Sequence, residues 1–86
     1  MSWDDIREHY PQQWVLVEAI NASTVDNMRQ IDNIDMVDTF ADFRAAWVAY
    51  ESLHRTQPKR ELYVLHTRRE RLDIEVAQSL GMVMRR

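Results

Sequence analysis

The sequence predicts an α+β fold, in which a three- to four-stranded, mostly antiparallel sheet carries one main helix on one face. Apolar residues alternate with period two in four segments, as strands do, and recur at helical spacing in one segment between the second and the third. With a short helix before the first strand, the expected order is α-β-β-α-β-β. The strand segments are Trp14–Ile20, Ile34–Phe40, Leu62–His66 and Leu72–Val76, and the helical stripe is Phe43, Ala46, Trp47, Tyr50 and Leu53.

The 86 residues are enough for one small domain and too few for two. We expect that domain to span residues 1–76, and residues 77–86 to form a C-terminal tail or a short docking helix. A domain of this size buries only about 60–65% of the surface of its unfolded chain, so each large aromatic residue matters to the core.

The first helix is expected over Trp3–His9. Ser2 followed three residues later by Asp5 is typical of a capping box, which satisfies free backbone N–H groups at a helix start. So short a helix is not stable alone. We therefore expect Trp3 and Ile6, which share one of its faces, to dock on the sheet.

The first strand is expected over Gln13–Ile20, because its β-branched and large residues are interrupted only by Glu18. The polar segment from Asn21 to Asn33 has no glycine and is expected to form a long hairpin loop. The strand should present Trp14, Leu16 and Ile20 on one side and Val15, Val17 and Ala19 on the other.

The second strand should alternate regularly except at Asp38, which falls on its apolar side and indicates a bulge or an edge position. The main helix should follow, with Asp42 in its first turn and with alanines that raise its helix propensity. It should end near Thr56, before the segment Gln57–Arg60.

The third strand, expected over Glu61–His66, has apolar residues on both faces and is therefore expected inside the sheet. On the sheet face opposite the main helix, Val15, Val17 and Leu65 would stay exposed, because only short terminal helices could cover them. A large exposed apolar patch is unusual in a monomer, so a homodimer is expected to form through this face.

Three aromatic motifs stand out, which are Tyr10-Pro11-x-x-Trp14-Val15-x-Val17-Glu18, Ala46-Trp47-x-x-Tyr50-x-x-Leu53-His54 and Tyr63-x-x-His66-Thr67. Through them the chain resembles a group of small uncharacterised bacterial proteins over about residues 3–76. The resemblance implies a small bacterial α+β domain. Since it brings no assigned activity, it transfers no catalytic residue.

Charge is distributed unevenly, although the net charge is only −3. Residues 1–43 hold nine acidic and two basic residues, a balance of −7, whereas residues 44–86 hold five acidic and nine basic residues, a balance of +4. Ten of the eleven basic residues are arginine, whose planar guanidinium favours paired contacts with carboxylates. The two halves therefore pair within the fold, or the arginine-rich half meets an acidic protein partner or a second copy of the chain.

The chain has no cysteine, which excludes disulfides, thiolate metal sites and thiol nucleophiles. Its acidic N-terminal segment lacks the features of a secretory signal, and no apolar run approaches the roughly 20 residues that span a bilayer. We expect a cytoplasmic protein with no membrane partner.

Glu18, His54 and His66 are the polar candidates for an active or ligand-binding site. The two histidines could lie close together if the main helix packs on the face that carries His66, and a buried Glu18 would have a raised pKa suited to acid–base chemistry. The alternative is that the histidines have capping and core-edge roles, and that Glu18 lies at an edge or pairs with an arginine. No recognised ligand spacing occurs, so we expect neither a metal nor a cofactor.

Arginine-rich segments flank the third strand and predict an interaction surface. Nucleic-acid binding would require exposed aromatic residues between them, and the overall acidity of the chain disfavours it. The residues of this surface are Arg68, Arg69, Arg71, Arg55, Arg60 and Tyr63.

The sequence therefore predicts a noncatalytic protein-interaction module that homodimerises. One alternative is a nucleic-acid-associated regulator that uses the arginine-rich turns. The other is a small ligand-binding domain or enzyme that uses Glu18, His54 and His66.

Overall fold

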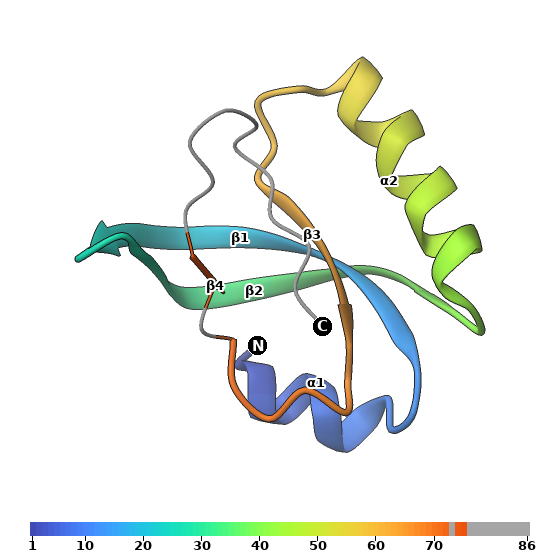
Figure 1. The fold of residues 1–86 in the computed structure, drawn as a ribbon, viewed down its shortest axis with the longest axis horizontal. Helices are drawn as coiled ribbons and strands as arrows, with labels where there is room; N and C mark the ends of the chain where they lie inside the picture. Colours follow the sequence, from blue (N-terminus) through green and yellow to red (C-terminus); the bar gives the residue numbers. More distant parts are fainter. Residues whose placement is uncertain (73, 76–86) are drawn as a thin grey trace.

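The computed structural model describes residues 1–72 and 74–75 of the chain. Its elements in chain order are α1 (Trp3–His9), β1 (Trp14–Val25), β2 (Met28–Phe40), α2 (Phe43–Thr56), β3 (Leu62–His66) and β4 (Ile74–Glu75). The strands form one antiparallel sheet in the order β3-β1-β2-β4 (Figure 1). The α+β class and the antiparallel sheet are therefore confirmed.

The end of the chain matches the prediction only in part. Of the fourth strand predicted over Leu72–Val76, the described residues in strand conformation are Ile74–Glu75, which pair with Arg29 and Met28 of β2. The tail or docking helix predicted over residues 77–86 lies outside the described residues.

The predicted capping box at the start of α1 is confirmed. The Ser2 hydroxyl accepts a hydrogen bond from the Asp5 backbone N–H at 3.1 Å, and the Asp5 carboxylate accepts one from the Ser2 N–H at 3.2 Å. Trp3 and Ile6 are buried, as predicted, and the Trp3 indole N–H donates to the carbonyl of Arg69 at 2.8 Å. The short helix is thus held in place by the sheet and by the turn after β3.

The hairpin of β1 and β2 is much longer than predicted, and the expected loop over Asn21–Asn33 is wrong. Residues of that segment continue the strand pairing up to Asp26 and Asn27, whose φ angles are 51° and 64°. Positive φ at both central residues is typical of a type I′ turn, whose twist matches that of the two strands. At the far end of the hairpin most β1 residues are exposed, and residues 28–33 of β2 are exposed or only half-buried. This segment needs few apolar residues, which explains why its sequence lacks a clear apolar alternation.

Bulges bend this hairpin. Leu16 pairs with Asp38 and the next residue, Val17, pairs with Met36, so the bulge predicted near Asp38 is confirmed. Two further register shifts lie on either side of Asn21. Ile20 sits at the first of them and is exposed, unlike the buried Leu16 with which it is predicted to share a side.

The two helices pack on opposite faces of the sheet, and each covers its own apolar cluster. The α2 cluster holds Leu16, Ala46, Tyr50, Leu62 and Val64, and the α1 cluster includes Trp3, Ile6, Val15, Val17, Tyr63, Leu65 and Ile74. The face predicted to need a second chain is therefore buried within one chain, and the expectation that it is exposed is wrong.

The predicted place of β3 inside the sheet is also wrong for the part of the chain that the structure describes, where β3 lies at one end of the strand order. Its residues Leu62–Leu65 are all buried. Burial on both faces comes from the helical layers above and below the strand, which an edge strand can have as well as a central one.

Candidate protein interface

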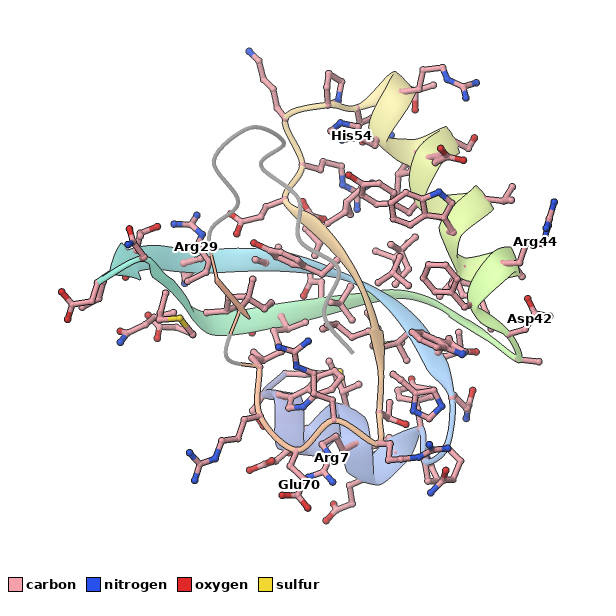
Figure 2. The ribbon with its side chains drawn as sticks, in the orientation of Figure 1. Arg7, Arg29, Asp42, Arg44, His54 and Glu70 are labelled. Atoms are coloured by element: carbon pink, nitrogen blue, oxygen red, sulfur yellow. The ribbon has the colours of Figure 1, made fainter. Side chains whose placement is uncertain are left out.

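Helix α2 begins at Phe43, directly after Asp42. The Asp42 carboxylate accepts a hydrogen bond from the Ala45 N–H at 2.8 Å, so Asp42 is the N-cap of the helix. The prediction that Asp42 lies in the first turn is therefore wrong. Ala46 and Tyr50 are the buried residues of the helix, and they face β1 and β3. Figure 2 shows the side chain of Arg44 pointing away from the sheet, on the opposite side of α2.

The outward side of α2 carries an exposed apolar surface. Phe43 is 39% exposed and Val48 is 58% exposed, with the half-buried Trp47 between them. Arg44 and Glu51, both exposed, flank these residues. These five residues line a shallow hollow, and we call them the α2 outer face.

Aromatic contacts fix the shape of the α2 outer face. Phe43 stacks on Trp47 with ring centroids 5.9 Å apart, and Trp14 of β1 contacts Phe43 edge-on at 5.1 Å. Trp47 in turn contacts the buried Tyr50 at 5.0 Å. Because the exposed Phe43 ring rests on the half-buried rings of Trp14 and Trp47, it is presented in a preformed arrangement, which lowers the entropy lost on binding.

The two candidate histidines lie at opposite ends of this aromatic run. His54 stacks on Tyr50 at 5.4 Å, and His66 contacts Trp14 edge-on at 5.0 Å. Eleven helical residues, about 16 Å, separate His54 from Phe43, which lies next to Trp14. Burial, followed by the positive charge of Arg68, lowers the pKa of His66. The structure does not bring the two imidazoles together.

The third polar candidate, Glu18, is held by an arginine. Arg60 donates to the same carboxylate oxygen through Nε at 3.0 Å and Nη2 at 2.6 Å. The predicted pairing of Glu18 with an arginine of the basic half is confirmed. Across residues 1–72 and 74–75, no group of three or more histidine, aspartate and glutamate side chains is placed to hold a metal ion.

Some arginines of the predicted arginine-rich surface are exposed, and others donate hydrogen bonds within the chain. Arg55, Arg68 and Arg71 are exposed, whereas the Arg69 guanidinium donates to the carbonyl of Arg71 at 2.8 Å and to the carbonyl of Leu72. The acidic protein partner for this surface stays a prediction.

Tyr63 cannot serve as the exposed aromatic residue between the two basic segments. It is only 4% exposed, and its hydroxyl donates to the Glu61 carboxylate. Tyr63 is one of the alternating residues of β3 that belong to the α1 cluster. The prediction that Tyr63 forms part of the interaction surface is therefore wrong.

The sequence-based prediction did not find the α2 outer face, because Phe43 and Trp47 share the helical stripe of the core. The available signal was Val48, a large apolar residue outside that stripe. Next to Phe43 and Trp47, Val48 makes the apolar stripe of the helix wider than the side that packs on the sheet, so part of the stripe stays exposed.

No protein-family model, curated protein or solved structure matches this chain. The resemblance to the small bacterial group therefore stays a prediction, and the geometry carries the functional argument. Among the described residues, no helix is both long and apolar enough to cross a membrane.

Proposed function

We propose that this protein is a noncatalytic protein-interaction module that homodimerises through the α2 outer face. The observation that carries this proposal is the exposure of Phe43 and Val48 beside Trp47 on a capped helix. Aromatic residues supply large contact areas at low entropic cost, and they are enriched in protein interfaces. A charged rim around an apolar centre is the usual anatomy of such a surface.

This proposal moves the interface from the sheet to the helix. The sheet residues that first suggested dimerisation, including Val15 and Leu65, are buried by the chain itself. The α2 outer face is formed by the other side of a helix whose inner side is already packed, so binding a partner there requires no unfolding of the domain.

The proposal keeps the setting predicted from the sequence, a bacterial protein of the cytoplasm. The lack of cysteine and the resemblance to small bacterial proteins support it. It also keeps the predicted element order α-β-β-α-β-β, which the pairing of Ile74–Glu75 with β2 supports.

Sedimentation equilibrium over a wide concentration range tests the proposal. We expect the wild-type protein to shift from monomer to dimer with concentration, and Val48→Glu to remain monomeric because it places a charge at the centre of the contact. Val25→Glu is the matched control, since Val25 is an exposed valine, 45% exposed, at the far end of the hairpin.

A wild-type protein that stays monomeric at the highest concentration would contradict the proposal. Equal loss of the dimer in Val25→Glu and Val48→Glu would also contradict it, because the α2 outer face would then have no special role. Far-UV circular dichroism of both variants establishes that they are folded.

A further inference from the structure

We infer that two copies of the chain associate through antiparallel α2 helices, with Arg44 of each copy on Glu51 of the other. This inference rests on the proposed function and specifies its partner and geometry. The two-fold axis would pass close to Trp47 and Val48, the midpoint of the helix segment between the two charged residues.

The positions of the exposed residues along α2 lead to this arrangement. Arg44, Val48 and Glu51 follow one another at spacings of four and three, so they lie on one side of the helix. All three are exposed, and the half-buried Trp47 borders them. In Figure 1, α2 lies at the outside of the molecule, with the sheet on one side and none of the other helices or strands beyond it.

The two charges on this stripe lack ion-pair partners within the described part of the chain, where the ion pairs are Arg29–Glu61 and Arg60–Glu18. Seven residues, or about 10.5 Å of helix rise, separate Arg44 from Glu51, so the two cannot pair within one helix. The charge of Glu51 does act on the neighbouring Tyr50. The pKa of Tyr50 is raised first by burial and then by this negative charge.

The order of the charges selects the orientation of the second copy. In a two-fold interface every contact occurs twice: if Arg44 of one copy contacts Glu51 of the other, Glu51 of the first copy contacts Arg44 of the other. An antiparallel pair therefore forms two Arg44–Glu51 contacts and places Val48 against Val48. A parallel pair would instead place Arg44 against Arg44 and Glu51 against Glu51, which costs free energy.

The size of the surface indicates a weak dimer. A standard stable interface buries about 1,600 Å² in total. One face of the 14-residue helix α2 from each of two copies provides less area than that. The association should therefore depend on concentration in the range accessible to sedimentation. It should also respond strongly to single charges.

Charge reversal and mixing test the inference. We expect Arg44→Glu and Glu51→Arg each to weaken self-association at least about tenfold, because each places like charges opposite one another twice. The double variant Arg44→Glu/Glu51→Arg should regain wild-type association. An equimolar mixture of the two single variants should form a heterodimer more readily than either variant associates with itself.

Two variants control for the change in total charge. Lys59→Glu matches the charge change of Arg44→Glu, and Glu8→Arg matches that of Glu51→Arg; both residues are exposed and lie outside α2. If the wild-type protein dimerises but the α2 variants behave like these controls, the inference is overturned while the proposed function stands. If the wild-type protein stays monomeric, both fail.

Discussion

Arg29 of β2 forms a two-point ion pair with the carboxylate of Glu61, the residue before β3. The two partners meet although β1 lies between β2 and β3 in the sheet. Arg29 Nε and Nη2 donate to the two carboxylate oxygens at 2.7 and 2.6 Å, and the Tyr63 hydroxyl donates to the same group. The register shifts on either side of Asn21 lie between the two partners, and bulges bend strands. We attribute the approach of Arg29 to Glu61 to this bend, and Figure 2 shows Arg29 beside β1.

Glu61→Gln should lower the free energy of unfolding by about 1.5 kcal/mol at pH 7, because the half-buried Arg29 loses its charged partner. The hydrogen bonds from Arg29, and with them that from Tyr63, lower the pKa of Glu61 below its usual value of 4.5 against the opposing effect of burial. As the pH falls, the unfolded chain therefore binds a proton at Glu61 before the folded chain does. The stabilisation is complete above the unfolded pKa and is lost as the pH falls through the lowered one.

Urea unfolding of the wild-type protein and Glu61→Gln between pH 7 and pH 3 measures this difference. The gap between their unfolding free energies should narrow in acid. Glu8→Gln, which alters an exposed glutamate of α1, is the control and should leave stability nearly unchanged. A gap that stays constant down to pH 3 would show that folding does not perturb the Glu61 carboxyl.

Tyr63 should make the protein less stable in alkali. Burial, and then the hydrogen bond to Glu61 and its charge, raise the pKa of Tyr63 well above its usual value of 10.0. A group with a raised folded pKa contributes stability below its unfolded pKa, and this contribution is lost as the pH rises. We therefore expect the unfolding free energy to fall above pH 10, and to fall less in Tyr63→Phe.

Denaturant unfolding at pH 8 and pH 10.5 compares the two proteins. Tyr50, whose pKa burial also raises, should keep a residual alkaline slope in the variant. An identical slope in the wild-type protein and Tyr63→Phe would mean that the Tyr63 phenol titrates as it does in the unfolded chain.

Local signals predicted the parts of the fold that depend on neighbours in sequence. The Ser2–Asp5 capping box, the main helix ending at Thr56 and the alternation of Leu62–Leu65 are confirmed, whereas Phe43 of the predicted core stripe is exposed. These features follow from hydrogen bonds and periodicity within a few residues, and tertiary contacts did not override them.

The remaining features depend on contacts between distant segments. Whether Val15 is covered depends on where α1 docks, and no pattern inside β1 contains that information. The same holds for the candidate site, because the engagement of Glu18 requires Arg60, 42 residues away. The sequence offered the two possible states of Glu18, and only the arrangement of the strands decides between them.

Asp42→Ala should destabilise the protein by about 1 kcal/mol, because it removes the carboxylate that satisfies a backbone N–H at the start of α2. Asp42 adjoins Phe43, so fraying of this turn should also loosen the α2 outer face. Chemical denaturation measures the first effect, and the concentration dependence of sedimentation measures the second. Asp32→Ala, at an exposed aspartate of β2, is the control. A stability of Asp42→Ala equal to that of the control would argue against the cap.

The turn at Asp26 and Asn27 offers the sharpest test of the long hairpin. Asn27 has φ of 64°, a conformation that costs a β-branched residue about 1–2 kcal/mol and that glycine adopts without strain. Asn27→Val should therefore lower the free energy of unfolding by about that amount, whereas Asn27→Gly creates the Asp-Gly pair favoured in type I′ turns and should be neutral or stabilising. Thermal unfolding of the three proteins ranks them directly. In the long hairpin loop expected from the sequence, valine at this position would hardly change the free energy of unfolding. Equal stabilities of the valine and glycine variants would therefore support the loop and contradict the type I′ turn.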